Sequence, residues 1–328
     1  MKVKINSLIE YCTTKLINAG ATKSDAEIVV RHLLEEELLG KHSHGFIRLP
    51  SVIKTICSFS AKRECNVDDN SCGTKRLVFS NTLGLVAAQS AVEHALDVLR
   101  DKTIAMVSAI GYTGTTGALG YYSRLFAKKG FVSIVSCSSE YAVAPWGGKD
   151  AILGTNPIAI GIPNGDSPVV CDFSTAAMTY GELMLAAKEG RTVPYGIVID
   201  AQGNPSNDPN DANNGAQLPM AQHKGYALGL AVEILAGVFI GAKAGKDAVV
   251  GSDGIIMIAF RPDVFVDKQQ FSDGLNALIN EIKSSSLATN SLGIRIPGEN
   301  SLKTVQQGYE TNICEIPDEV YKDLMELQ

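Results

Sequence analysis

Short apolar runs alternate with amphipathic stretches between residues 75 and 137, and this alternation limits the possible folds more than any other feature. Branched and aromatic residues dominate the runs at 76–79, 104–109 and 131–137, while helix-period patterns occupy 85–99 and 119–128. Such alternation is typical of an α/β sheet that carries helices on its faces. Later apolar runs at 158–162, 169–171, 197–200 and 255–260 predict further strands, and 271–282 and 317–327 predict further helices. We therefore predict an α/β fold.

The chain before this region has a helical pattern instead. Apolar side chains recur at helix spacing up to Gly20, where the first helix is expected to end. A capping-box sequence at 24–27 predicts the start of a second helix, which ends at Gly40. Residues 58–73 are polar and rich in turn formers, so we predict a domain boundary there.

The length of 328 residues suits about two domains. We predict a helical region over 1–73 and an α/β domain over 74–299, with the tail 300–328 packed on the helical region. The net charge is -6 and no run of lysine or arginine is present, which argues against nucleic acid or an anionic membrane as a partner. Small molecules are the expected partners.

The longest apolar stretch, residues 225–242, has Glu233 near its middle. Because burial of a carboxylate in lipid is costly, we expect a buried helix rather than a membrane span. The N-terminus lacks the apolar core of a signal peptide, and the seven cysteines include no Cys-x-x-Cys pair. These features predict a cytoplasmic protein with reduced thiols and no structural metal.

A glycine-rich segment, Gly111-Tyr112-Thr113-Gly114-Thr115-Thr116-Gly117, lies between a predicted strand and a predicted helix. Glu140 follows the next strand, as the ribose-binding acid of a dinucleotide site would. The spacing is nevertheless Gly-x-x-Gly-x-x-Gly rather than Gly-x-Gly-x-x-Gly, so the glycines do not fall where a pyrophosphate needs them. The segment therefore argues against a standard Rossmann site.

The loop after the second helix, Ser43-His44-Gly45 with Arg48, pairs an imidazole with a guanidinium four residues away. One helical turn would point His44 and Arg48 the same way. Arg48 could then grip a carboxylate while His44 exchanges a proton with a neighbouring oxygen. Taken alone, the segment favours an ordinary capped loop with a solvated arginine, and the rest of the chain changes that balance.

Two further segments are candidate anion sites. Asp172-Phe173-Ser174-Thr175 follows a predicted strand and is expected to open a helix, where it binds a phosphate or ribose or serves as a simple N-cap. His223 and Lys224 precede the apolar helix at 225, and a cation at the positive end of a helix is unfavourable unless an anion is bound.

Several of these motifs appear together in one order along the chain. They are Ser43-His44-Gly45 with Arg48-Leu49-Pro50, Ala144-Pro145-Trp146-Gly147-Gly148, Leu153-Gly154-Thr155-Asn156-Pro157, Asp172, Lys224-Gly225-Tyr226 and Pro297-Gly298-Glu299. In this order, over about residues 8–310, the chain resembles the malate/L-lactate dehydrogenase family, which includes sulfolactate, ureidoglycolate and diketogulonate oxidoreductases.

The resemblance implies a non-Rossmann, mixed-sheet α/β fold with an N-terminal helical domain, and a homodimer with its active site near the subunit interface. It implies hydride transfer between NAD or NADP, held by the 74–299 domain, and a small 2-oxo or 2-hydroxy acid. By position, His44 resembles the proton donor and Arg48 the carboxylate ligand. The cofactor contacts implied are Ser139, Glu140, Asp172, Phe173, Ser174, His223, Lys224, Gly298 and Glu299.

The chain departs from the family at Thr115, where relatives commonly have a histidine, and at Val52, where a tyrosine is common. A threonine hydroxyl donates a hydrogen bond but does not titrate near neutral pH, so Thr115 is a candidate catalytic residue of altered role. The default substrate pair is malate and oxaloacetate. Two alternatives stay open: a catalytically impaired paralogue that binds the dinucleotide, and a reductase of cyclic ketimine carboxylates.

Overall fold

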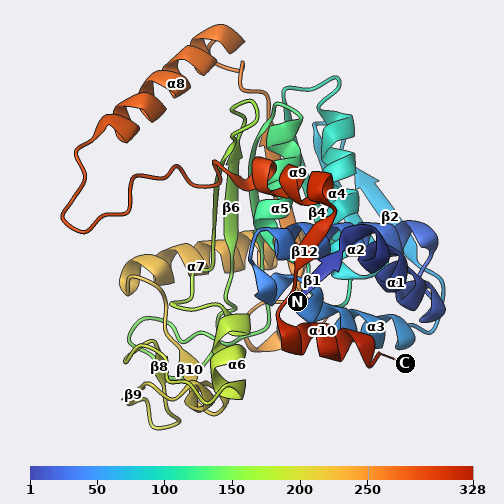
Figure 1. The fold of residues 1–328 in the computed structure, drawn as a ribbon, viewed down its shortest axis with the longest axis vertical. Helices are drawn as coiled ribbons and strands as arrows, with labels where there is room; N and C mark the ends of the chain where they lie inside the picture. Colours follow the sequence, from blue (N-terminus) through green and yellow to red (C-terminus); the bar gives the residue numbers. More distant parts are fainter. Residues whose placement is uncertain (250, 328) are drawn as a thin grey trace.

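A seven-stranded mixed sheet forms the centre of the molecule, and helices cover both of its faces (Figure 1). The computed structural model describes residues 1–249 and 251–327. The strand order is β2-β3-β4-β11-β5-β6-β7; β3 and β4 run parallel, and the other neighbours run antiparallel. The strands are β2 (Glu64–Asp69), β3 (Thr74–Ser80), β4 (Ile104–Ile110), β5 (Val132–Cys137), β6 (Ile158–Ile162), β7 (Val169–Phe173) and β11 (Gly254–Phe260). The predicted mixed-sheet α/β class is confirmed.

Strand β11 explains why this sheet is not a simple parallel one. It comes late in the sequence and inserts antiparallel between β4 and β5. Ile255 and Met257 belong to the core that contains residues of α4 (Gly84–Val98) and α5 (Leu119–Lys128), while Ile256 packs with residues of α7 (His223–Ala236) on the other face. Because both faces are covered, the strand is apolar along its whole length.

The N-terminal helices and the C-terminal tail share one core. Buried side chains of α1 (Ile5–Asn18), α2 (Lys23–Leu38) and α3 (Leu49–Cys57) pack with Cys314, Ile316, Val320 and Leu324 of the tail. Strand β1 (Lys2–Lys4) pairs antiparallel with β12 (Ile313–Glu315), and α10 (Asp318–Met325) follows, so the two chain ends lie on the same side of the molecule (Figure 1). The division of the chain at residue 73 stays a prediction.

A small three-stranded sheet and one helix lie below the main sheet in Figure 1. The sheet has the order β10-β8-β9. Its strands are β8 (Val198–Ile199), β9 (Pro205–Ser206) and β10 (Ala216–Gln217), beside the 3-10 helix η3 (Pro209–Asn213) and helix α6 (Tyr180–Lys188). The apolar run predicted at 197–200 therefore contributes its strand to this small sheet, and α6 was not predicted.

Two boundaries differ from the sequence prediction. Helix α2 is capped by Thr22, whose side chain accepts a hydrogen bond from the Asp25 amide, so the capping box expected at 24–27 lies inside the helix. The polar segment 58–73 contains β2, which pairs with β3 at the edge of the main sheet. Every residue of β2 is exposed, so the strand lacks the apolar face by which strands are recognised.

Helix α7 is only partly buried, although the sequence predicted a buried helix. With the 3-10 helix η4 (Val238–Ile240) it is long and apolar enough to cross a membrane by length and composition. Val232, Glu233 and Ala236 are buried against the protein, whereas Ile234, Leu235 and Phe239 are exposed. Glu233 accepts hydrogen bonds from the Gly154 and Gly245 amides and from Asn156, which explains a carboxylate in an apolar helix.

Helix α8 (Lys268–Ser284) projects outward from the main sheet, with Lys283 near its end paired with Glu299, and the following segment returns to α9 (Ser301–Thr311) (Figure 1). None of the α8 residues is buried. Phe265 before the helix and Leu292 after it are 95% and 98% exposed. The arm therefore carries apolar side chains that the described chain leaves uncovered.

Candidate active site

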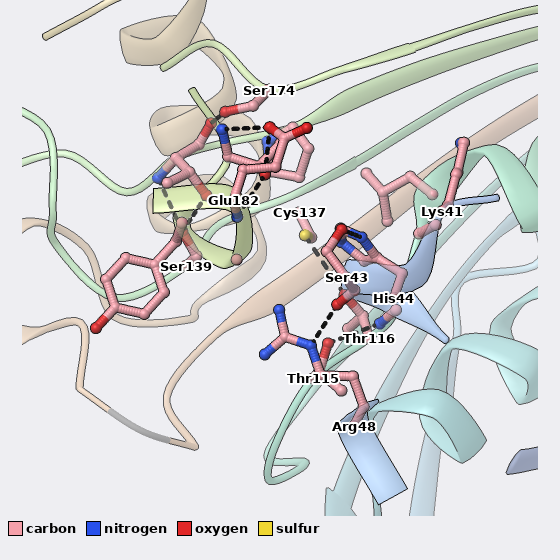
Figure 2. Close-up of a pocket in the computed structure, with 18 of the residues that line it drawn as sticks. Lys41, Ser43, His44, Arg48, Thr115, Thr116, Cys137, Ser139, Ser174 and Glu182 are labelled. Atoms are coloured by element: carbon pink, nitrogen blue, oxygen red, sulfur yellow. Dashed lines mark hydrogen bonds between the residues drawn. The ribbon is translucent and has the colours of Figure 1, made fainter. Parts of the chain in front are cut away.

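A cavity of about 750 Å³ lies between the loop after α2, the glycine-rich segment after β4, the ends of β5 and β7, and the start of α6. Figure 2 shows side chains from these elements converging on it. Eight of the twelve predicted site residues line the cavity: His44, Arg48, Thr115, Ser139, Glu140, Asp172, Phe173 and Ser174. Segments far apart in the sequence are thus brought to one place.

The Ser43-His44-Gly45 loop is held by the buried carboxylate of Glu37. One Glu37 oxygen accepts a hydrogen bond from the Phe46 amide at 2.9 Å, and the other lies 2.5 Å from His42 Nδ1. A Cβ at Gly45 would come within 1.9 Å of Glu37 Oε2, so the loop needs glycine there. Two 3-10 turns result, η1 (His42–His44) and η2 (Phe46–Arg48), instead of one helical turn.

His44 and Arg48 both line the cavity, as predicted from their spacing. The Ser43 hydroxyl lies 3.0 Å from His44 Nδ1, which leaves Nε2 for a ligand. Arg48 Nε donates to the Ser43 carbonyl at 2.7 Å, which fixes the guanidinium. Burial, and next the charge of Arg48, lower the pKa of His44, so the imidazole is mostly neutral near pH 7.

The start of α6 covers the Arg48 end of the cavity. A Cβ at Gly181 would lie 3.0 Å from Arg48 Nη2 and 3.2 Å from Ser43 Cβ. Burial lowers the pKa of Arg48, and no carboxylate among the described residues forms an ion pair with it. A partly desolvated guanidinium without an acidic partner is a site for an anionic ligand.

Lys41 links the loop to β7. Its ammonium nitrogen donates to Asp172 Oδ2 at 2.7 Å and lies 3.7 Å from Glu36 Oε2. The fully buried Glu36 also pairs with the buried Arg124. Lys41 lines the cavity, but its positive charge is already paired with the carboxylates of Asp172 and Glu36, whereas Arg48 has no such partner among the described residues.

The glycine-rich segment forms a loop between β4 and α5, as predicted, and its glycines serve packing. Gly111, Gly114 and Gly117 all have positive φ angles. A Cβ at Gly111 would come within 2.2 Å of the Phe79 carbonyl oxygen, and one at Gly117 within 2.1 Å of His32 Nε2. The Thr115 hydroxyl oxygen accepts a hydrogen bond from the Gly117 amide at 2.9 Å, which leaves its proton free for a ligand.

Ser139 and Ser174 meet at Thr155. Ser139 Oγ accepts a hydrogen bond from the Thr155 amide at 2.9 Å, and Ser174 Oγ donates to the Thr155 carbonyl at 2.9 Å. The prediction that a helix opens at Ser174 is wrong, because β7 is followed by an irregular segment up to α6. Glu140 and Phe173 are exposed and line the cavity on either side of these serines.

Four predicted cofactor contacts lie outside this cavity. His223 and Lys224 were predicted to precede the apolar helix; they are the first two residues of α7 and are exposed. Gly298 packs on Val170, where a Cβ would come within 2.8 Å. Glu299 pairs with Lys283 of α8 at 2.5 Å. Their assignment as cofactor contacts stays a prediction.

Sequence reasoning missed several residues that line the cavity: Lys41, Thr116, Cys137, Tyr180, Glu182 and Asp253. Lys41 directly precedes the predicted loop, so its position was a signal in the sequence. Asp253 precedes a strand that lands beside β5 only through the β11 insertion, which no local pattern reveals. Among residues 1–249 and 251–327, no group of three or more His, Cys, Asp or Glu side chains could hold a metal ion.

Comparison with known proteins identifies relatives over almost the whole chain. Malate/(S)-sulfolactate dehydrogenase of Methanothermus fervidus is 34% identical over 94% of this chain and 96% of its own length. The (2R)-3-sulfolactate dehydrogenase (NADP(+)) of Chromohalobacter salexigens is 31% identical over 93% of this chain and 91% of its own length. Ureidoglycolate dehydrogenase (NAD(+)) of Escherichia coli is 28% identical over 99% of this chain and 95% of its own length.

Solved structures have the same fold. Sulfolactate dehydrogenase from Methanocaldococcus jannaschii superposes with a TM-score of 0.88 at 29% identity, covering 100% of this chain and 96% of that one. The delta1-piperideine-2-carboxylate reductase from Pseudomonas syringae superposes with a TM-score of 0.87 at 26% identity, covering 100% of both chains.

Residues 3–325 match the family described as malate/L-lactate dehydrogenase. This match spans the mixed sheet, the helices on both faces and every wall of the cavity. The chain therefore belongs to the malate/L-lactate dehydrogenase family of oxidoreductases.

Proposed function

We propose that this oxidoreductase transfers a hydride between NAD or NADP and a small 2-oxo or 2-hydroxy acid in the cavity beside His44 and Arg48. The observation that carries the proposal is Arg48, a half-buried guanidinium that lines the cavity and has no carboxylate partner among the described residues. A carboxylate can accept two parallel hydrogen bonds from such a group. Relatives named for NAD(+) and for NADP(+) support a nicotinamide cofactor and leave both forms as candidates.

The cavity fits a nicotinamide cofactor together with a small acid. Its volume of about 750 Å³ is within the range of ordinary cofactor sites. Ser139, Glu140, Phe173 and Ser174 line one side with hydroxyls, a carboxylate and an aromatic face, which suit ribose hydroxyls and a ring. We propose these residues and Asp172 as cofactor contacts, and keep His223, Lys224, Gly298 and Glu299 as further contacts predicted from the resemblance.

The side chains have separate tasks in the proposed reaction. Arg48 binds the substrate carboxylate and so fixes the neighbouring carbonyl beside His44. When bound, the reduced nicotinamide supplies the hydride that adds to the carbonyl carbon. His44, whose Nδ1 faces the Ser43 hydroxyl, acts in its doubly protonated form, which it reaches by taking up a proton from solvent; it gives the Nε2 proton to the carbonyl oxygen, the imidazole is left neutral, and the product is the hydroxy acid. The Thr115 hydroxyl donates a hydrogen bond to that oxygen.

The proposal is tested by the absorbance of reduced nicotinamide during turnover. NADH and NADPH are each offered with oxaloacetate, pyruvate, sulfopyruvate, 2-oxoglutarate and a cyclic ketimine carboxylate. Turnover that is lost in His44→Ala while cofactor binding is kept supports the mechanism, and oxaloacetate is the expected substrate. Normal turnover in His44→Ala removes His44 from the reaction. Cofactor binding without turnover on any substrate favours an impaired paralogue.

A second candidate is the reduction of a cyclic ketimine carboxylate. Two observations favour it: the structural similarity to delta1-piperideine-2-carboxylate reductase, and a cavity in which Lys41 is already paired with Asp172. Arg48 then suffices for a substrate with one carboxylate, whereas a dicarboxylate needs a second cation. A higher kcat/KM with the cyclic ketimine carboxylate than with oxaloacetate would support ketimine reduction as the function.

We also propose a homodimer. An exposed apolar patch lies on α7 and η4 and consists of Leu230, Ile234, Leu235, Val238 and Phe239. The segments before and after α8 add the exposed side chains of Phe265 and Leu292. Exposed apolar patches of this kind mark protein interfaces. A second copy offers matching surfaces related by twofold symmetry. Light scattering during size-exclusion chromatography tests this, and a monomeric mass at micromolar concentration contradicts it.

A cytoplasmic location is proposed from the thiols. All seven cysteines are free, and three of them, Cys57, Cys65 and Cys72, are exposed. Exposed free thiols suit a reducing compartment. Cell fractionation tests this proposal, and recovery of the protein outside the cytoplasm contradicts it.

A further inference from the structure

Asp253 directly precedes β11 and lines the cavity from the side of the main sheet. The following residue, Gly254, is fixed to the end of β5, because its amide donates to Ser138 Oγ and its carbonyl accepts from the Ser138 amide. Gly251 lies against Thr113 of the glycine-rich segment. Asp253 is therefore anchored between the two segments that supply Thr115 and Ser139 to the cavity.

The Asp253 carboxyl group lacks both an ion-pair partner and a hydrogen-bond partner for its buried oxygen among the described residues. Its Oδ1 atom is buried and has no hydrogen-bond partner among residues 1–249 and 251–327, and the side chain forms no ion pair there. A buried polar atom without a partner costs free energy unless a bound molecule satisfies it. The cavity is where such a molecule would lie.

The groups that face Asp253 decide its protonation state. Glu140 follows β5 and Glu233 comes from α7, and both are acidic. The Cys137 thiol at the end of β5 and the Tyr112 phenol after β4 are the other titratable neighbours. Burial, together with Glu140 and Glu233, raises the pKa of Asp253 to about 7. The carboxyl group is therefore protonated, and a hydrogen-bond donor, over a range where most aspartates are ionised.

We propose that Asp253 is a ligand-contacting residue, which donates a hydrogen bond from its protonated carboxyl group to an uncharged oxygen of a molecule bound in the cavity. This inference rests on the proposed function. Two bound molecules have such an oxygen: the nicotinamide, in its carboxamide carbonyl, and the substrate, in a carbonyl or hydroxyl group. Either oxygen accepts from a neutral acid and is repelled by a carboxylate.

The test measures two constants across pH 5.5 to 9: the Kd of NADH and of NADPH, by nucleotide fluorescence, and the KM of the acid at saturating cofactor. Asp253→Asn keeps a donor at every pH, Asp253→Ala removes it, and the exposed Asp247→Asn is the matched control. Thermal unfolding of each variant separates loss of binding from loss of folding.

We expect Asp253→Ala to raise either the Kd of the cofactor or the KM of the acid by roughly 3- to 10-fold at pH 6.5. The wild-type protein should lose affinity for the same molecule as pH rises through 7, while Asp253→Asn should stay within about twofold and show no such dependence. A change in Kd assigns the contact to the cofactor, and a change in KM assigns it to the substrate.

Two results overturn the inference. If Asp253→Ala alters thermal unfolding but neither Kd nor KM, the Asp253 carboxyl group contributes to the stability of the fold and not to ligand binding. If the wild-type protein turns over normally and Asp253→Asn has the wild-type pH dependence, the carboxyl group is not the donor. Absence of nicotinamide binding in the wild-type protein is a different failure, because it removes the proposed function first.

Discussion

The Lys41 ammonium nitrogen lies 2.7 Å from Asp172 Oδ2, which ties the loop after α2 to the end of β7 across the cavity. One residue comes from the N-terminal helical segment and the other from the main sheet, 131 positions later. The contact fixes the distance between the loop that carries His44 and the strand end that carries Phe173. Among the described residues that line the cavity, Arg48 is then the guanidinium or ammonium group without a carboxylate partner.

Replacement of Lys41 by Met should leave Asp172 and the buried Glu36 less compensated. We expect a loss of about 1–2 kcal/mol in the free energy of unfolding, reduced because Lys41 is partly exposed. Urea denaturation measures this loss. Lys2→Met, which breaks the exposed pair with Glu315, is the control and should change stability by less than about 0.5 kcal/mol. Equal effects of the two variants would contradict a special role of Lys41.

Arg48→Lys should raise the KM of the acid substrate by about 10- to 100-fold, because an ammonium group cannot form the paired hydrogen bonds of a guanidinium. The Kd of the nicotinamide cofactor should stay within about twofold of the wild-type value. Steady-state kinetics and fluorescence titration give the two constants. Arg191→Lys, at an exposed ion pair with Glu189, is the control. An unchanged KM would place the substrate carboxylate elsewhere.

Gly45→Ala should disrupt the catalytic loop, since the added Cβ would come within 1.9 Å of Glu37 Oε2. Displacement of Glu37 would release the Phe46 amide and shift His44. We expect a fall in kcat/KM of at least about 10-fold, as for other misplaced catalytic groups. Gly274→Ala, on the exposed α8 where a Cβ meets nothing within 4 Å, is the matched control. Equal kcat/KM in the two variants would show that the loop tolerates the methyl group.

His32 should make the protein sensitive to acid. Burial lowers its pKa to about 3, and its Nε2 accepts a hydrogen bond from the Ala118 amide, so the folded protein holds it neutral. The unfolded chain takes up a proton near pH 6.5, so stability falls as pH drops below 6.5, by at most about 1.4 kcal/mol per pH unit. His32→Gln keeps an acceptor and should show a smaller loss between pH 6.5 and 5. Parallel curves in urea denaturation would exclude this contribution.

Glu233→Ala should destabilise the protein by about 2–4 kcal/mol, because the Gly154 and Gly245 amides and Asn156 lose their shared acceptor in the interior. The exposed Glu281→Ala on α8 is the control and should fall within about 0.5 kcal/mol of the wild-type protein. Denaturant midpoints compare the two. A small effect of Glu233→Ala would mean that water replaces the carboxylate.

The sequence predicted those helices, strands and loops that are determined by neighbouring residues in the chain. Strand and helix alternation, the loop after Gly40 and the glycine-rich turn all follow from side-chain period and turn chemistry. Fully exposed β2 and the short, partly exposed α6 were missed because they lack an apolar face long enough to detect. The exposed face of α7 was missed because composition reports an apolar helix without saying what covers it.

The candidate site was predictable in part for the same reason. His44 and Arg48 are neighbours in sequence, so their spacing alone suggested a joint role. The pairing of Lys41 with Asp172 and the contact of Gly254 with Ser138, which places Asp253 at the cavity, depend on strand order, which residue patterns do not encode. The resemblance supplied Ser139, which lines the cavity although no local signal marks it. Glu140 and Phe173 also line the cavity, and their positions after predicted strands had already suggested them.

The insertion of β11 has a consequence for synthesis of the chain. Thr115 follows β4 and Ser139 follows β5, yet these strands touch β11 rather than each other. Before residues 254–260 leave the ribosome, the growing chain contains both halves of the sheet but lacks β11, the strand that joins them. The pairing of β11 with β4 and β5 joins residues that are far apart in the sequence, and forming such contacts is slow compared with local helix formation. The enzyme therefore acquires its cavity only near the end of translation, and shorter nascent chains should bind no nicotinamide.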